Sequence, residues 1–399
     1  MDQDYNQAKV ERLYNTYPFP PDPLSDDLPP GYNWRWNWQA AHNFALGEKP
    51  KQNNIRILDA GCGTGVSTEY LIYLNPTAEV VAIDLSEKAL AIAQQRSERS
   101  GVLKGRSPKV TFQHIKIEQA DKLEGEFNLI NCVGVLHHLP DPIAGIKSLA
   151  AKLAPGGLLH VFVYADLGRW EIQLMQKAIK LLQKEKEDYQ AGVSIGRDIF
   201  ASLPENNRLL KREKERWALE NHWDQSFADM YVHPLEFDYS IKTLFELIDS
   251  ANLEFLGFSN PQYWQLERLL GKSPQLMELS ENLSLKERYQ LIELLDPDIT
   301  HYEFFLGRPP LSRTDWSDDL VLKNAVAEVH PCLYGWPEQS FLDYEYQPVS
   351  LSDAQYNFMR SCDGRTPIAE ILGELNLDNV RSLQDRQLIM LSKAHQESD

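Results

Sequence analysis

Cysteine is scarce in this 399-residue chain, which has only Cys62, Cys132, Cys332 and Cys362. The four lie far apart in the sequence and form no CxxC pair. A disulfide framework or a zinc knuckle needs more closely spaced cysteines, so the sequence disfavours both. We therefore expect reduced, mostly buried thiols and no metal site.

Long hydrophobic runs and an excess of basic charge are also missing. No apolar stretch approaches the roughly 18 residues of a membrane span, and the first residues, MDQDYNQAKV, lack the pattern of a signal peptide. We therefore expect a cytoplasmic protein with no membrane partner. The chain has 40 Lys and Arg against 58 Asp and Glu. Its net charge of −18 repels polyanions, which disfavours nucleic acid as a partner.

A regular alternation of strand-like and helix-like segments runs through the middle of the chain. IRILDA and EVVAID have the pattern of buried strands, and a helical stretch follows each of them. VTFQHI, FNLINCVGVL and LLHVFVY continue the alternation, and NLEFLGFS and HYEFFLGRP supply a sixth and a seventh strand. Because strands joined by helices run parallel, we expect an α/β fold with a doubly wound, seven-stranded, mostly parallel sheet.

The sequence divides into three parts around this alternation. Residues 1–50 are rich in proline and aromatics, and we expect a lid that is either strapped onto the core or forms a wall for the substrate. Its YNWRWNW run would place four aromatics on one side of an extended segment. Residues 51–310 form the main domain, with a helical insertion at about 166–235 over the carboxyl edge of the sheet.

The last part, residues 311–399, carries 7 Lys and Arg against 15 Asp and Glu. Helical segments are expected at SDAQYNFMRSC, TPIAEILGEL and NVRSLQDRQLIMLSKA. The sequence thus predicts a small, acidic, mainly helical accessory domain.

The most informative motif is LDAGCGTG, where the first strand ends and a helix begins. Gly61 and Gly63 allow a tight turn and a close approach by a ligand, and the amino end of the helix attracts an anionic group. A nucleotide-like ligand is therefore expected. A dinucleotide fingerprint would place glycine at the position of Val66, and the carboxylate of Asp59 would repel a pyrophosphate. Asp59 is better suited to a cationic group on the ligand.

Asp84 ends the second strand, nineteen residues after Gly65. A carboxylate at this place can accept hydrogen bonds from the two ribose hydroxyls of an adenosine. The alternative is that Asp84 caps the next helix, but Ser86 is available for that role. We therefore expect Asp84 to bind a ribose.

In this order and spacing, the motifs resemble those of the class I S-adenosylmethionine-dependent methyltransferases. LDAGCGTG is similar to the first motif of that family, AIDLS to its second strand end, NCVGVLHHLPDP to the segment after its fourth strand and LAPGGLLH to the turn into its fifth. The resemblance is close over residues 55–164 and looser over 1–310. It implies S-adenosylmethionine as the cofactor. It also implies a cofactor site that includes Asp59, Gly61, Gly63, Gly65, Asp84, Leu85, Ile117 and Val133.

The sequence departs from that family after the third strand. Family members often have an acidic residue there for the adenine amino group, whereas HIKIEQ places Lys116 or Ile117 at about that point. We therefore expect backbone groups near Ile117 to contact the adenine.

Four side chains are candidates for catalysis. A sulfonium methyl group is already electrophilic, so a general base is needed only for a hydroxyl or a protonated amine. His137 and His138 follow the fourth strand, His233 lies in YVHPLEF and Tyr164 ends the fifth strand. Three of them have a structural alternative, which is a loop-fixing hydrogen bond for His137 and His138 and packing beneath the insertion for Tyr164.

Three functions are compatible with these features. The leading hypothesis is a methyltransferase for a small or medium organic molecule, held in an apolar pocket under the lid and the insertion. The second is an RNA or protein methyltransferase that docks its substrate through the C-terminal domain, although the net charge counts against RNA. The third is a non-catalytic regulatory protein that binds the cofactor while its C-terminal domain engages a protein partner.

Overall fold

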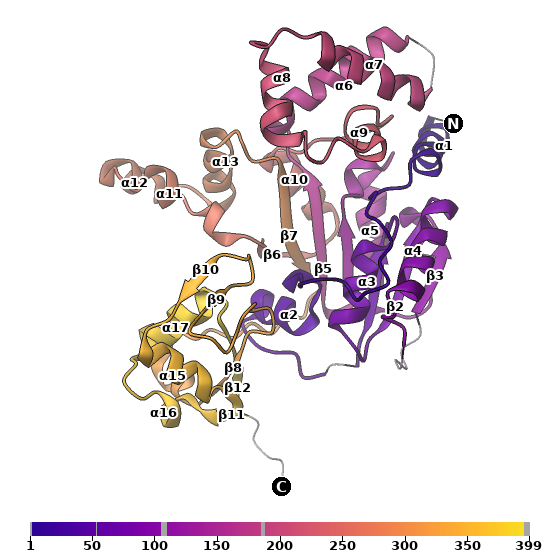
Figure 1. Cartoon of the computed structure of the whole chain (residues 1–399). Coiled ribbons are helices and arrows are strands. Elements are labelled where there is room, and N and C mark those ends of the chain that lie inside the picture. Colours follow the sequence, from indigo (N-terminus) through magenta and orange to yellow (C-terminus); the bar gives the residue numbers. More distant parts are fainter. Residues whose placement is uncertain (1, 53, 105–109, 185–187, 395–399) are drawn as a thin grey trace.

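A seven-stranded sheet forms the centre of the molecule in the computed structural model, which describes residues 2–52, 54–104, 110–184 and 188–394 (Figure 1). The strand order is β3-β2-β1-β4-β5-β7-β6, with β1 to β5 parallel and β7 antiparallel to both of its neighbours. The strands are β1 (Arg56–Ala60), β2 (Glu79–Asp84), β3 (Val110–His114), β4 (Phe127–Val133), β5 (Leu153–Tyr164), β6 (Glu254–Phe258) and β7 (His301–Gly307). The predicted doubly wound, mostly parallel sheet is confirmed.

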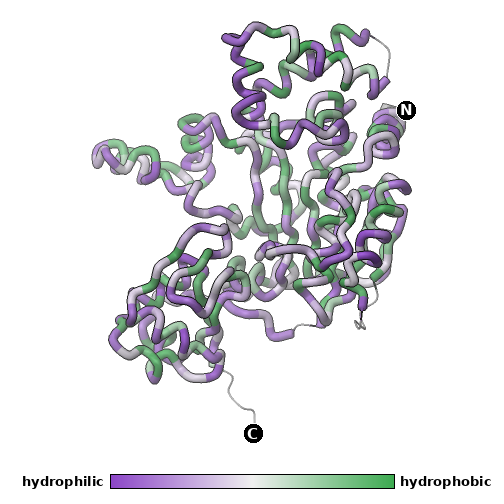
Figure 2. Tube along the Cα trace, viewed as in Figure 1, coloured by the Kyte–Doolittle hydropathy of each residue, from purple (hydrophilic) through white to green (hydrophobic). Residues whose placement is uncertain are grey.

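Helices cover both faces of the sheet, which explains why its strands read as nearly continuous apolar runs. In β2, Val81 and Ile83 point into the core on one face and Val80 into the core on the other. In Figure 2 the apolar residues lie along the central strands. On the first face lie α5 (Pro142–Lys152), α10 (Ile241–Ser250) and α13 (Leu285–Leu295), and on the second lie α2 (Trp38–Leu46), α3 (Val66–Leu74) and α4 (Glu87–Arg99).

The connections after the strands carry the candidate site, because the carboxyl ends of parallel strands meet at one edge of a sheet. A glycine turn joins β1 to α3. The 3₁₀ turn η2 (Ile117–Lys122) follows β3, and η3 (Leu136–His138) follows β4.

The N-terminal region begins with α1 (Asp2–Thr16) and reaches the sheet through the 3₁₀ turn η1 (Trp34–Trp36). The prediction that YNWRWNW forms an extended segment is wrong. The side chain of Asn33 accepts a hydrogen bond within η1 and that of Asn37 caps α2, so helical turns replace the extended chain. The aromatics therefore point in different directions. Trp34 is fully buried in the core, whereas Trp36 faces the cavity described below.

A layer of helices lies beyond the carboxyl end of β5, beside α1 (Figure 1). It has its own apolar core, to which α1 contributes Leu13. Its helices are α6 (Trp170–Gln183), α7 (Tyr189–Ser202), α8 (Arg208–Arg212), the π-turn η5 (Glu213–Trp217) and α9 (Asp224–Tyr231), preceded by the short turn η4 (Leu167–Arg169). Three short helices precede α13: η6 (Pro261–Trp264), whose Trp264 is buried in the core, and α11 (Glu267–Leu270) and α12 (Pro274–Ser280), which project from the body.

The C-terminal region combines helices with two small sheets. LIMLSK, expected at the end of a helix, instead forms β12, because its apolar residues are buried and pair with β8. The helices are α14 (Asp319–Lys323), α15 (Asp353–Ser361), α16 (Ile368–Ile371) and α17 (Leu377–Asp385), and the strands are β8 (Ala325–Val329), β9 (Ser340–Leu342), β10 (Pro348–Ser350), β11 (Asp363–Pro367) and β12 (Ile389–Lys393). Within the described residues, none of the helices has both the length and the apolar character of a membrane span.

Trp34 joins the N-terminal region, the sheet and the C-terminal region, because its ring centroid lies 4.8 Å from that of Phe44, 5.8 Å from Phe305 and 5.7 Å from Tyr344.

Trp34→Ala should lower the free energy of unfolding by roughly 3–5 kcal/mol, since it leaves a cavity in a fully buried site. Denaturant titration followed by circular dichroism measures this change. Trp223→Ala is the control, because Trp223 is 49% exposed and its removal should cost about 0.5 kcal/mol or less. Equal losses in the two variants would contradict the anchoring role of Trp34.

Candidate active site

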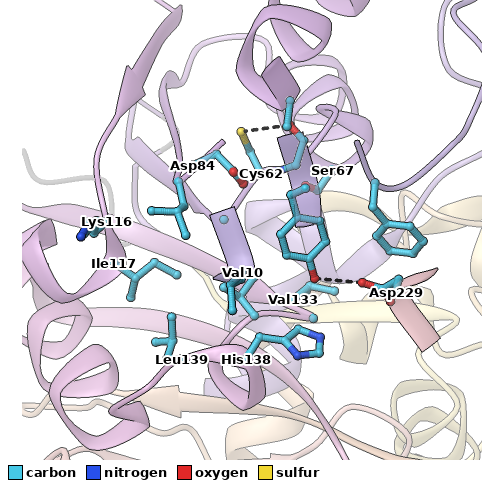
Figure 3. A pocket seen from close by; sticks show the side chains of 18 of the residues that line it. Val10, Cys62, Ser67, Asp84, Lys116, Ile117, Val133, His138, Leu139 and Asp229 are labelled. Carbon is cyan, nitrogen blue, oxygen red and sulfur yellow. Dashed lines mark hydrogen bonds between the residues drawn. The ribbon is translucent and has the colours of Figure 1, made fainter. Parts of the chain in front are cut away.

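A cavity of about 320 Å³ opens at the carboxyl edge of the sheet (Figure 3). Ligand pockets in proteins have volumes of roughly 300–1,000 Å³. The glycine turn, the ends of β2 and β4 and the turns η2 and η3 form its floor and sides. The remaining wall comes from α1, Phe19, Pro20 and Trp36 of the N-terminal region, together with the end of β5 and Asp229 of α9. The N-terminal region therefore encloses a site that the sheet alone would leave open.

Gly61 and Gly63 line this cavity and both have left-handed backbone conformations, with φ of +79° and +52°. A Cβ atom on Gly61 would lie 2.5 Å from a methyl group of Val135. One on Gly63 would lie 2.4 Å from the carbonyl oxygen of Phe19. Both the backbone conformation and the surrounding atoms therefore require glycine at these two positions.

The Asp84 side chain lies at the cavity, at the end of β2. Its Oδ2 accepts a hydrogen bond from the Gly63 N–H at 2.8 Å, and its Oδ1 accepts one from the Ser86 N–H at 2.8 Å. Ser86 caps α4, as the sequence suggested, by accepting a bond from Ala89 N–H at 3.1 Å. Burial raises the pKa of Asp84. Each of its oxygens has two acceptor sites, so the carboxylate can receive further donors from a ligand.

Asp59, which the sequence placed among the cofactor-binding residues, does not line the cavity but lies behind its wall. Its Oδ2 accepts hydrogen bonds from the hydroxyls of Ser67 at 2.8 Å and Thr68 at 2.6 Å, and its Oδ1 accepts one from the Asn131 amide at 2.8 Å. These donors hold the side chain inside the protein, where it is 1% exposed. Gly65 also does not line the cavity. It lies at the start of α3, in close contact with α4.

A chain of buried polar groups continues from Asn131 across the sheet. The Asn131 amide nitrogen donates to Asp59, so its oxygen accepts from Trp36 Nε1 at 3.0 Å and from His160 Nδ1 at 2.9 Å. His160 Nε2 lies 3.1 Å from a carboxylate oxygen of Glu303. The other oxygen of Glu303 pairs with Arg35 at 2.7 Å. This network connects the glycine turn to the N-terminal region.

Leu85, Ile115, Lys116, Ile117 and Glu118 line the cavity on the Asp84 side. Ile117 thus lies at the cavity, and its predicted contact with the adenine stays a prediction. Glu118, one residue further along, places a carboxylate at the cavity after β3, which the sequence prediction missed. Two hydrogen bonds link this segment to α1: Lys116 donates to the Gln7 amide oxygen at 2.7 Å, and the Gln7 amide nitrogen donates to Glu118 at 3.2 Å.

His138, Tyr164, Asp229 and Tyr14 line the cavity elsewhere, and in Figure 3 His138 and Asp229 lie across from Lys116 and Ile117. Tyr14 donates a hydrogen bond of 2.9 Å to Asp229. His138 Nδ1 lies 3.0 Å from the carbonyl oxygen of Leu235, which can only accept, so Nδ1 carries a proton. In neutral His138 the lone pair is then on Nε2. Burial lowers the pKa of His138, which favours this neutral form.

The other two candidate histidines do not reach the cavity. His137 is fully buried, and its ring centroid lies 3.9 Å from that of Tyr164. The His233 ring is stacked on that of His138 at 3.7 Å and faces a second cavity. Burial lowers the pKa values of both well below the usual range. The structure therefore brings all four candidates together but exposes only His138 and Tyr164 to the site.

Three residues of this cluster escaped sequence analysis because no motif marks them. Tyr14 lies in α1 and Asp229 in α9, far along the sequence from the strand ends that carry the motifs. Arg169 lies 3.4 Å from the Tyr164 ring centroid and forms an ion pair of 3.1 Å with Glu236. The first two line the cavity, and Arg169 supports Tyr164 from behind.

Known proteins resemble this chain in sequence and in overall fold. The methyltransferase domain family matches residues 57–157. A ubiquinone biosynthesis O-methyltransferase of Aromatoleum aromaticum is 33% identical over 144 residues, which are 34% of this chain and 56% of that protein. Residues 57–157 thus form a methyltransferase domain of the class I S-adenosylmethionine-dependent type. The chain is therefore a methyltransferase enzyme, and its cofactor is S-adenosylmethionine.

Two further comparisons extend over nearly the whole methyltransferase. An uncharacterized protein of Synechococcus sp. strain PCC 6301 is 54% identical over 392 residues, covering 96% of this chain and 93% of that protein. The structure of PKMT2 from Rickettsia typhi in complex with AdoHcy covers 92% of this chain and 77% of that one, with a TM-score of 0.62 and 14% identity. At this level of identity the structural match shows a shared fold.

Glu303 provides a pH-dependent test of the buried network. Although burial acts to raise its pKa, the hydrogen bond from His160 and the charge of Arg35 lower the pKa of Glu303 to about 2 from 4.5. An acid with a depressed pKa stabilises the folded state above its unfolded pKa, and this stabilisation is lost as the pH falls through the folded value. Glu303→Gln should therefore lower the unfolding free energy by roughly 3 kcal/mol at pH 7 and by less at pH 3.

Denaturant titration at both pH values measures this difference. Glu254→Gln is the control, because Glu254 forms an ion pair with Arg313 in which both side chains are about half exposed. That variant should show a small effect at both pH values. A Glu303→Gln penalty that does not shrink between pH 7 and pH 3 would contradict the ionised network.

Proposed function

We propose that this enzyme transfers the methyl group of S-adenosylmethionine to a small or medium-sized organic acceptor held in the same cavity as the cofactor. The observation that carries the proposal is that one cavity has a carboxylate at one wall and a potential base at another. The Asp84 carboxylate, fixed by two backbone N–H groups, lies at one wall, and His138, with Nδ1 protonated, lies at another.

The cofactor would lie along the glycine turn. In this proposal Asp84 accepts hydrogen bonds from the ribose hydroxyls, and Leu85 packs on the nucleoside. Ile117 and Glu118 flank the adenine, with the Glu118 carboxylate available to its amino group. Gly61, Gly63 and Val133 flank the methionine part, where glycine leaves room for the ligand; all these residues line the cavity.

The role of Asp59 is then to position the turn rather than to touch the cofactor. A buried carboxylate is costly unless hydrogen bonds satisfy it, and Ser67, Thr68 and Asn131 do so here. The ionised group in turn fixes the start of α3 and the end of β1, between which the glycine turn lies.

The reaction requires little of the protein beyond orientation and exclusion of water, because the bound sulfonium supplies an activated methyl group. We propose that His138 Nε2 accepts the proton of a hydroxyl or protonated amine on the acceptor as the new bond to carbon forms. Tyr164 and the Tyr14–Asp229 pair would orient the acceptor. His137 and His233 then act by packing, since His137 is buried behind Tyr164 and His233 is stacked on His138.

RNA or protein docking through the C-terminal region stays an alternative prediction. That region lies at the other end of the sheet from the helical layer that adjoins His138 (Figure 1). It contacts the N-terminal region instead, for example through the Arg35–Glu345 ion pair of 2.7 Å. This placement favours a small acceptor over a docked macromolecule.

Asp84→Ala should weaken the binding of S-adenosylhomocysteine by about 1–3 kcal/mol, because the ribose hydroxyls lose their acceptor. Isothermal titration calorimetry measures this change. Asp249→Ala is the control, because Asp249 is an exposed residue on α10 whose loss should leave binding unchanged. Unchanged affinity in Asp84→Ala would show that the ribose assignment is wrong.

His138→Gln should lower kcat by about 10²- to 10⁴-fold with a hydroxyl or amine acceptor, because the base is lost, while cofactor affinity stays close to that of the parent. Burial lowers the pKa of His138 from 6.5. The parent rate should therefore be constant near pH 7 and fall only below pH 6.5, as the base becomes protonated. Steady-state kinetics from pH 5 to 8 test both points.

His222→Gln is the control, because His222 is exposed and does not line the cavity. It should keep the parent rate and pH profile. If His138→Gln also kept both, His138 would not be the base.

A further inference from the structure

The Asp229 carboxylate is a buried group at the cofactor cavity with an incomplete set of partners. It lines the cavity from α9, and only 6% of the residue is exposed. Its Oδ1 accepts the hydrogen bond of Tyr14 at 2.9 Å, whereas its Oδ2 has no hydrogen-bond or ion-pair partner within the described part of the chain. An ionised carboxylate is costly to bury unless other groups compensate its charge. Asp229 is therefore placed to receive a partner from the cavity.

The protein itself supplies no cation for this carboxylate among the residues that the structure describes. Arg169, a buried cation of the same cluster, pairs instead with Glu236 at 3.1 Å and with Asp238 at 3.5 Å. Lys116 is the only lysine or arginine among the described residues of the cavity lining, and it lies across the cavity from Asp229 (Figure 3). Burial raises the pKa of Asp229, and a bound cation would act to lower it again.

Two further hydrogen-bond acceptors lie at the same end of the cavity. Neutral His138 has a lone pair on Nε2, and the Tyr164 hydroxyl oxygen can also accept. Neither atom has a hydrogen-bond partner within the described ranges. The ring centroids of His138 and Tyr164 lie 5.9 Å apart, and those of His138 and Tyr14, which donates to Asp229, lie 6.5 Å apart. The unpartnered polar atoms of this compact group can all accept hydrogen bonds.

Apolar side chains surround these acceptors. Phe162 lines the cavity, and its ring centroid lies 6.0 Å from that of Tyr164. Val133 and Leu139 line the cavity as well. Such a surface suits the carbon skeleton of an organic ligand, whose polar group then meets Asp229.

We infer that the methyl acceptor is an organic amine whose ammonium group binds Asp229. An ammonium group has a positive charge and up to three N–H donors, so it can bind the Asp229 carboxylate, the Tyr164 hydroxyl and His138 Nε2 together. A hydroxyl has one proton to donate and no charge, and Asp229 would repel a carboxylate or phosphate. The inference rests on the proposed methyl transfer and specifies the acceptor class.

The reaction of an amine uses each of these groups. The ammonium gives one proton to His138 Nε2 and keeps its hydrogen bond to Asp229. The nitrogen lone pair attacks the methyl carbon as the carbon–sulfur bond breaks, and the electron pair of that bond stays on sulfur. The products are S-adenosylhomocysteine and a methylated ammonium, and His138 then returns its proton to water. Each turnover therefore releases one proton.

The preference for a cation can be measured without turnover. Matched amines and alcohols of increasing size, beginning with benzylamine and benzyl alcohol, are titrated by calorimetry into the enzyme saturated with S-adenosylhomocysteine. At least one amine should bind about tenfold more tightly than its alcohol, and Asp229→Asn should remove this difference. Asparagine keeps an oxygen for the Tyr14 hydrogen bond, so this variant retains that contact. If no amine in the series bound more tightly than its alcohol, the inference would be wrong.

Two further variants separate the charge of Asp229 from its structural contact. Tyr14→Phe removes the hydrogen bond but leaves the carboxylate, and it should keep the preference for amines. Asp224→Asn is the matched control, because Asp224 lies on the same helix, has a side chain that is 56% exposed and does not line the cavity. It should also keep the preference. An equal loss in all three variants would show that the charge is not the cause and would overturn the inference.

The sulfonium of the cofactor is the other cation that enters this cavity. Calorimetry with S-adenosylmethionine and S-adenosylhomocysteine therefore provides a separate test. We expect Asp229→Asn to leave the ratio of the two affinities unchanged. If the variant weakened binding of S-adenosylmethionine about tenfold more than that of S-adenosylhomocysteine, Asp229 would be the counter-ion of the sulfonium, and the amine assignment would be wrong.

Turnover distinguishes this inference from the proposed function. With the same series, the formation of S-adenosylhomocysteine should favour amines by about tenfold or more in kcat/KM, and Asp229→Asn should lose this preference mainly through KM. Selective binding of amines with no turnover of any compound would contradict methyl transfer and leave the cation site supported. Equal turnover of alcohols and amines would support methyl transfer and contradict the amine assignment.

Discussion

The buried carboxylate of Asp59 is the constraint on which the cofactor cavity depends. Its hydrogen bonds to Ser67, Thr68 and Asn131 fix the glycine turn between β1 and α3. Through Asn131 the same network reaches Trp36 on the cavity wall and, further on, His160, Glu303 and Arg35. The turn that shapes the site and the N-terminal region that encloses it are thus held by one connected set of buried groups. Such a network is stabilising only when its members are satisfied together.

Elements outside the sheet build the rest of the site. The sheet provides the edge at which Asp84 and the glycine turn meet, whereas α1 and the segment from Asp229 to Glu236 close that edge. The same two elements form walls of the second cavity. The helix α1 therefore forms part of the cavity that we assign to the cofactor.

Much of the fold was predictable because its signals are local. Strand patterns, the LDAGCGTG turn and Asp84 each depend on a few consecutive residues, and the structure has all seven strands where the pattern put them. Tyr14 and Asp229 meet only through long-range packing, which leaves no periodic trace in the sequence. The prediction for YNWRWNW was wrong because the helix caps at Asn33 and Asn37 outweigh the alternation of aromatic and polar residues, which favours an extended chain. In LIMLSK, pairing with β8 outweighs the helical pattern that precedes it.

A crystal structure of the enzyme with bound S-adenosylhomocysteine tests the central claim most directly. We predict that the ribose hydroxyls lie within hydrogen-bond distance of Asp84, that the sulfur lies between the glycine turn and His138, and that Asp59 keeps its three protein partners. A nucleoside bound elsewhere, or one whose ribose faces away from Asp84, would contradict this assignment of the cavity.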